Sequence, residues 1–226
     1  MPKQPRSDAS WPDELEQLIR HGRDREAAAL AAEKMSIPAE GRSMDPRAQL
    51  DAIVPSLTDL VATIDDSQLD APTPCAAFSV RDVLAHMIGG ATLFAAAFTD
   101  ETPGEPPAGD LRQGLPIALE GLRASVHSDG ALDRTIAAPF GEVPGAAFAR
   151  FVALDGLVHG WDIATATGQP YEPPADLVEA VDTFAREAIT DDMRDGDTFA
   201  PPTAAPDGAS PLEQLVAFTG RTVGGA

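Results

Sequence analysis

The amino-acid sequence predicts an all-α fold, a helical bundle with a small pair of strands. Composition is the first observation: apolar residues make up 43% of the 226 residues, aromatic residues only 5%, and Ala, which favours helix, is abundant. The second is periodicity, because apolar residues recur every three or four positions in several segments. The third is the spacing of Pro and Gly, which separate these segments by short and medium loops. Segments with one apolar face each pack together as a bundle.

The first 43 residues differ from the rest in charge. They hold 7 Lys/Arg and 8 Asp/Glu, a net charge of −1, whereas the whole chain has −20, so residues 44–226 carry −19. We therefore treat residues 1–43 as an N-terminal extension and 44–226 as the main domain. Residues 13–35 are compatible with a helix, and Met44 is an alternative start. The sequence leaves open whether the extension is an arm, a partner helix or an artefact of the assigned start.

Six helices are expected in the main domain, over residues 46–64, 79–98, 115–126, 145–167, 174–189 and 212–218. Pro55 is expected to kink the first helix. Ser79 suits the N-cap of the second, with Asp82 three residues later as its capping partner. Pro116 suits the first turn of the third helix, and Gly168 suits the C-terminal end of the fourth. Turn residues in segment 132–145 indicate a short strand pair.

Charge and cysteine content exclude several classes of function. A net charge of −20 argues against binding nucleic acid or an anionic membrane surface; it indicates a solubility charge or a site that attracts cations. Cys75 is the single cysteine, so no intrachain disulfide can form, which fits a reducing compartment. No segment is expected to cross a membrane, and the N-terminus lacks the apolar core of a signal peptide. These observations predict a cytoplasmic protein.

The expected helix 145–167 carries the most informative pattern. Apolar residues and two polar ones, Asp155 and His159, recur at spacings of three and four and therefore share a face. A carboxylate on such a face is costly unless it is paired or bound to a cation. His86, in the second helix, follows Val83 and Leu84 and is expected to face inward as well. Two His and one carboxylate suit Zn²⁺, Ni²⁺, Fe²⁺ or Mn²⁺ and leave positions open for water or substrate.

A structural interpretation of the same residues remains open. Asp155 and His159 can form an internal ion pair, and His86 can be an ordinary core histidine. Asp162 either orients a ligand from behind or lies on the polar flank, and Trp161 either packs in the core or lines a pocket. Cys75 is expected to be a buried structural thiol with no neighbouring base in sequence.

Four stretches together resemble the DinB-like proteins of the mycothiol-dependent maleylpyruvate isomerase group. They are residues 73–87 (TPCAAFSVRDVLAHM), 139–145 (PFGEVPG), 157–169 (LVHGWDIATATGQ) and 215–221 (LVAFTGR). The resemblance implies a DinB-like four-helix bundle with a divalent metal, usually zinc, held by His86, Asp155 and His159. The isomerase carries Glu where this chain has Asp155, and it has a further C-terminal domain that is not expected here.

The resemblance also implies thiol chemistry. It suggests a metal-dependent S-transferase or thiol-assisted isomerase that uses mycothiol or a similar low-molecular-weight thiol on a small electrophilic substrate. Asp162 would then serve in catalysis and Trp161 in binding the cofactor. The alternative is a non-catalytic protein that binds a divalent metal or small ligand, such as a stress protein. A homodimer through exposed helix faces is also expected.

Overall fold

The computed structural model describes residues 44–76, 78–138, 141–194 and 199–224. It contains six α-helices and one small antiparallel sheet in these ranges, which confirms the predicted all-α fold with a strand pair. The expected helix at residues 13–35 lies outside the described residues.

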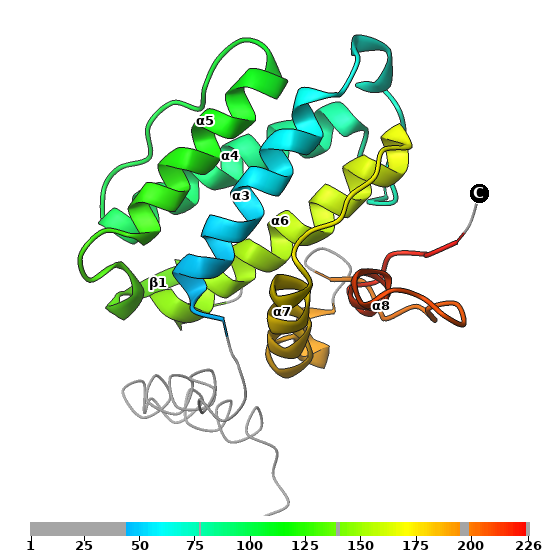
Figure 1. Cartoon of the computed structure of the whole chain (residues 1–226). Coiled ribbons are helices and arrows are strands. Elements are labelled where there is room, and N and C mark those ends of the chain that lie inside the picture. Colours follow the sequence, from blue (N-terminus) through cyan, green and yellow to red (C-terminus); the bar gives the residue numbers. More distant parts are fainter. Residues whose placement is uncertain (1–43, 77, 139–140, 195–198, 225–226) are drawn as a thin grey trace, which may run out of the picture.

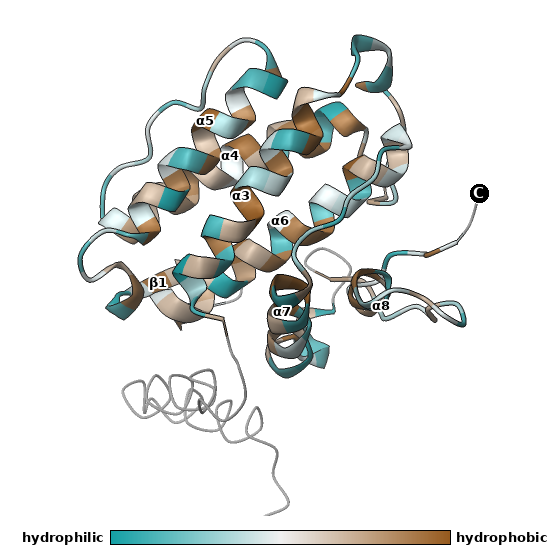
Figure 2. Ribbon diagram, viewed as in Figure 1, coloured by the Kyte–Doolittle hydropathy of each residue, from teal (hydrophilic) through white to brown (hydrophobic). Residues whose placement is uncertain are grey.

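Four long helices form the main body of the structure (Figure 1). They are α3 (Pro46–Ala62), α4 (Val80–Thr99), α5 (Leu111–Val126) and α6 (Gly145–Thr167). Helix α4 packs along α5, while α3 packs against both α5 and α6. Their apolar faces meet inside this body, and the hydrophilic residues lie mainly on the outer faces (Figure 2). Helix α6 is buried along most of its length because it also carries contacts to the C-terminal segment.

Local sequence signals set the ends of these helices. The Ser79 side chain accepts a hydrogen bond from the backbone N–H of Asp82, as predicted, and Asp82 accepts one from Ser79 in return. Gly168 ends α6 with φ at +69°, also as predicted. The predicted start of α5 is wrong. The helix begins a turn earlier, because Asp110 caps it, and Pro116 therefore lies inside the helix rather than in its first turn.

The strand pair fixes where α6 begins. Strands β1 (Thr135–Ala138) and β2 (Gly141–Pro144) pair antiparallel, with Ile136 opposite Val143. The N–H of Gly145, the first residue of α6, donates to the carbonyl of Arg134 at 2.7 Å. A Cβ atom at Gly145 would lie 2.3 Å from the carbonyl oxygen of Ala131, so only glycine permits this close approach.

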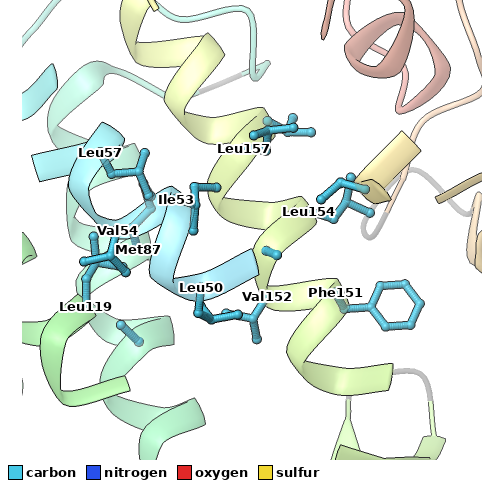
Figure 3. Close-up of a cluster of buried hydrophobic side chains, with 14 of the residues drawn as sticks. Leu50, Ile53, Val54, Leu57, Met87, Leu119, Phe151, Val152, Leu154 and Leu157 are labelled. Atoms are coloured by element: carbon cyan, nitrogen blue, oxygen red, sulfur yellow. The ribbon is translucent and has the colours of Figure 1, made fainter. Parts of the chain in front are cut away.

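The core between the helices is made of aliphatic side chains (Figure 3). Residues of α3, α4, α5 and α6 contribute to it, and the side chains that Figure 3 labels on these helices include Leu50, Ile53, Val54, Leu57, Met87, Leu119, Val152 and Leu157, all at most 8% exposed. Burial of such side chains stabilises the fold by about 1.5–3 kcal/mol each. This core holds α4 and α6 in a fixed relation, which positions side chains that the two helices share.

The C-terminal segment lies against α6. Helices α7 (Ala175–Ala188) and α8 (Pro211–Phe218) contact each other and α6. After α8 the chain turns at Gly220, whose φ of +99° favours glycine, and the N–H of Arg221 donates to the carbonyl of Val216. This turn brings Arg221 back to α6 and its functional residues.

Helix α4 corrects the expectation that no segment is long and apolar enough to cross a membrane. Its 20 residues pass that test by length and composition. One such helix is weak evidence of a membrane protein, because a helix that packs in a bundle passes the same test. Here α4 packs against α5 and α6.

Candidate metal centre

Two helices bring three potential metal ligands together. Asp155 and His159 lie one turn apart on α6, and His86 reaches them from α4. Asp155 Oδ1 lies 3.4 Å from His159 Nε2 and 3.7 Å from His86 Nε2. The imidazole rings of His86 and His159 meet edge to face, with centroids 5.0 Å apart. One donor atom from each of the three residues lies within 4.8 Å of the other two.

The spacing of these atoms fits a shared cation. Ligand atoms at about 2.0–2.1 Å from a tetrahedral zinc ion lie about 3.3 Å from one another. The separations of 3.4 and 3.7 Å are close to that value, and both exceed the usual length of a hydrogen bond to a carboxylate. Two imidazoles and one carboxylate are also a donor set that zinc accepts. The shorter side chain of Asp155, compared with Glu, still reaches both histidines.

The three side chains differ in exposure. His159 is buried, with 8% of the residue exposed. Asp155 and His86 retain 39% and 46% of their side-chain exposure. The expectation that His86 faces the interior is therefore wrong, since it lies at the rim, where α4 meets solvent. A cation held by this group would keep one side open to small molecules, which is the arrangement of catalytic rather than structural sites.

A buried carboxylate fixes the orientation of His159. Asp162 is fully buried and its Oδ2 accepts a hydrogen bond from His159 Nδ1 at 3.0 Å. With Nδ1 protonated, Nε2 presents its lone pair to the position that Asp155 and His86 share. A carboxylate behind a histidine ligand is a common support for metal sites. Because Asp162 lies behind the imidazole, its geometry suits a positioning role rather than direct contact with substrate.

Arg221 neutralises the charge of Asp162. Its Nη2 donates to Asp162 Oδ2 at 3.0 Å and its Nε to Oδ1 at 3.3 Å. Burial alone would lower the pKa of Arg221, but the carboxylate of Asp162 raises it, so the guanidinium remains charged. The sequence alone predicts no role for Arg221, although this residue ends one of the four stretches that carry the family resemblance.

The electrostatics of Asp155 and His159 favour the charged form of each of these two residues when no metal is bound. Burial by itself would raise the pKa of Asp155, but the two histidines lower it well below its ordinary value. Burial by itself would lower the pKa of His159, but Asp155 and Asp162 raise it to about 9. A cation that binds His159 Nε2 at neutral pH must therefore displace a proton.

Cys75 lies closer to this cluster than the sequence indicates. Its sulfur, a His159 ring nitrogen and an Asp162 carboxylate oxygen all lie within 4.8 Å of one another. The thiol is half-buried, and burial is the main cause that raises its pKa. The expectation that Cys75 has no neighbouring base holds along the chain but not in space, because His159 is beside it.

A cavity of about 160 Å³ opens beside the three residues. Asp155, His159 and Arg221 form its polar end, and the remaining side chains that line it are Phe94, Phe148, Phe151, Val152, Leu154, Val158 and Phe199. Trp161 is partly buried against the core and does not line this cavity in the described part of the chain. The cofactor-binding role of Trp161 therefore stays a prediction without support from its contacts.

Residues 50–164 match the model of the mycothiol maleylpyruvate isomerase N-terminal domain, a range that includes His86, Asp155, His159 and Asp162. The chain belongs to this family. It is a metal-binding domain family associated with mycothiol, which agrees with the donor set described above.

Two proteins of Mycobacterium tuberculosis, from strains CDC 1551 / Oshkosh and H37Rv, are each 34% identical to this chain over 188 residues. The matches cover 80% of this chain and 100% of each relative, and both relatives bear the name uncharacterized protein. No solved structure matches the chain. Arg221 lies outside the range that the family model covers, and the structure places its guanidinium against Asp162.

Proposed function

We propose that the protein is a metal-dependent enzyme of thiol chemistry, a mycothiol-type S-transferase or a thiol-assisted isomerase that acts on a small electrophile. The observation that carries the proposal is the convergence of His86 Nε2, Asp155 Oδ1 and His159 Nε2 at spacings suited to one cation, with an exposed side. Zn²⁺ suits this donor set best, with Ni²⁺, Fe²⁺ and Mn²⁺ as alternatives.

Each part of the site has a role under this proposal. A divalent cation, when bound, makes a thiol ligand a thiolate near neutral pH and polarises a substrate carbonyl. Asp162 and Arg221 hold His159 in the tautomer that presents Nε2. The exposed side, at His86 and Asp155, admits the thiol. The apolar cavity next to Asp155 and His159 excludes water from the substrate.

The transfer reaction is a substitution at carbon and needs no external oxidant or reductant. The thiolate sulfur forms a bond to the electrophilic carbon, and the bond from that carbon to the leaving group breaks with its electron pair. The proton that the thiol loses is taken up by the leaving group or by solvent. In the isomerase version the sulfur adds to an activated double bond and departs after the bond has rotated. Only the thiolate form of the thiol is nucleophilic, which is why the metal is required.

The first experiment measures metal content. Protein purified without added metal, and the same protein after incubation with zinc and desalting, are analysed for metal per chain. We expect one zinc ion in the wild type and none in His159→Ala. His127→Ala is the matched control, because His127 lies at the end of α5 and bonds to Asp51, outside the cluster. A zinc content that His159→Ala leaves unchanged would overturn the site.

The second experiment tests turnover. Mycothiol and a panel of small electrophiles are incubated with the zinc-loaded and the metal-free wild type, and thioether or isomer formation is followed by mass spectrometry. We expect product with the zinc-loaded protein alone. Zinc binding without any product would instead support the alternative, a non-catalytic metal- or ligand-binding protein with the same three ligands. Turnover that survives metal removal would refute a metal-dependent reaction.

A cytoplasmic location and a homodimer belong to the same proposal. A low-molecular-weight thiol acts as a reductant in the cytoplasm, where a single free cysteine is also stable. Cell fractionation tests the location, and light scattering of the purified protein tests the homodimer.

A further inference from the structure

The cavity beside the candidate metal centre has the character of a hydrocarbon pocket. Side chains of α6 form most of its wall, and Phe94 of α4 meets Phe148 of α6 there edge to face with centroids 5.0 Å apart. Phe151 and Leu154 extend from α6 on the side away from α3 (Figure 3), and both are at most 7% exposed. Apart from Asp155, His159 and Arg221, the wall is therefore made of Phe, Val and Leu side chains that offer no hydrogen-bond donor.

The size of the cavity limits what enters it. A volume of about 160 Å³ is close to that of an engineered protein cavity of about 150 Å³, lined by Leu, Ile and Phe, that stays dry and binds benzene. One six-membered ring or a branched alkyl group of equal size fits such a space. Two fused rings exceed this volume, so a second ring would have to lie outside the cavity unless a wall residue is removed.

The polar end is the second constraint. Asp155 and His159 belong to both the cavity wall and the metal group, so a ring in the cavity has one edge beside the ligands. Arg221 is the single Lys or Arg that lines the cavity in the described part of the chain, and two of its nitrogens are engaged with Asp162. A carboxylate on the far side of the ring would thus be desolvated without a partner, which is costly.

We propose that this cavity binds the apolar part of the substrate, and that the substrate is an uncharged electrophile bearing a single aromatic ring or a branched alkyl group. The inference rests on the proposed function, since it names the substrate class of the same site. It predicts that the reactive carbon lies at the edge of the ring nearest Asp155 and His159. A second carboxylate placed among the Phe, Val and Leu side chains of the cavity would find no partner.

Binding of small fluorinated probes tests the inference without metal or thiol. 4-Fluorobenzyl alcohol and 4-fluorophenylacetate carry the same ring, the first neutral and the second anionic. Titrations followed by ¹⁹F NMR on the metal-free full-length protein are expected to show at least tenfold tighter binding of the alcohol. Equal affinities, tighter binding of the anion, or no binding of either probe would overturn the proposal.

A change in cavity size provides an independent test. Phe94→Ala removes a partly buried wall residue and is expected to tighten the binding of 6-fluoro-2-naphthylmethanol at least tenfold relative to the wild type. Leu93→Ala is the matched control, because Leu93 is the neighbouring residue on α4, is 54% exposed and does not line the cavity. Equal naphthyl affinity of Phe94→Ala and the wild type, or no naphthyl binding by either, would contradict the assigned volume.

The outcomes separate the two proposals. If the probes do not bind but zinc binding and thiol transfer are observed, only the proposed substrate class is refuted. If the probes bind but zinc binding or product formation is absent, the proposed function is refuted and the cavity is an apolar ligand site. The comparison of neutral and anionic probes uses the wild type alone, so it does not depend on whether a variant folds.

Discussion

Replacement of Asp162 tests the support of the candidate metal centre most directly. The carboxylate is fully buried and accepts hydrogen bonds from His159 Nδ1 at 3.0 Å and from Arg221 at 3.0 and 3.3 Å. Asp162→Ala removes all three bonds and leaves the Arg221 guanidinium, 14% exposed, without its partner. An uncompensated buried charge of this kind destabilises a protein by about 3–5 kcal/mol. Asp162→Asn keeps the volume and one acceptor, so a loss of about 1.5–3 kcal/mol is expected.

The same variants are expected to weaken metal binding. Loss of the carboxylate behind a histidine ligand lowers metal affinity by about 10- to 100-fold, which corresponds to about 1.4–2.7 kcal/mol. The free energy of unfolding is measured by urea denaturation of the metal-free protein at pH 7, and zinc affinity by competition with a chromophoric chelator. Asp162→Asn is the informative variant for zinc, because it retains more of the fold than Asp162→Ala.

A surface ion pair provides the control for this experiment. Asp70 pairs with Arg81 at 3.0 Å, but 78% of the Asp70 side chain is exposed. Asp70→Ala is expected to change the free energy of unfolding by less than about 1 kcal/mol and to leave zinc affinity unchanged. If Asp162→Ala behaved like Asp70→Ala in both measurements, Asp162 would neither compensate Arg221 nor support His159.

Three further predictions concern residues around the same centre. Gly160→Ala would bring its Cβ within 2.4 Å of the hydroxyl oxygen of Tyr171, so urea denaturation is expected to show a free energy of unfolding lowered by about 1–3 kcal/mol. The control is Gly121→Ala, at a helical site with nothing within 4 Å of the added Cβ, which is expected to raise the free energy of unfolding by about 0.5–1 kcal/mol. Equal effects of the two variants would contradict this packing. Because the pKa of His159 is raised to about 9 from an ordinary 6.5, the stability that this group contributes to the metal-free protein is fully present below pH 6.5 and is lost as the pH rises through 9. Zinc affinity is expected to rise over the same range, and denaturation and competition titrations at pH 6, 7.5 and 9 would contradict this reasoning if both were flat. Cys75→Ser is expected to retain one zinc ion per chain, because Cys75 does not belong to the group of His86, Asp155 and His159. Loss of zinc in this variant would indicate that the metal binds instead to the neighbouring group, which includes the thiol of Cys75.

The sequence by itself determined the helices and the local partners within them. Spacing of three and four places Asp155, His159 and Asp162 on neighbouring positions of α6, since 3.6 residues make one turn. Capping at Ser79 and the C-terminal Gly168 depend only on adjacent residues, so these ends of α4 and α6 were predictable. The start of α5 was not, because Pro116 is tolerated inside that helix once Asp110 has capped it a turn earlier.

Only the tertiary structure decided how these residues meet and how far they are exposed. His86 comes from another helix, and its distance to Asp155 depends on how the aliphatic core holds α4 against α6. Arg221 reaches Asp162 across 59 positions of sequence through the turn at Gly220, and Cys75 reaches His159 from the loop before α4. Periodicity assigns a residue to a face of its own helix, whereas contact and burial depend on which other elements cover that face, and this is set by packing across the whole domain.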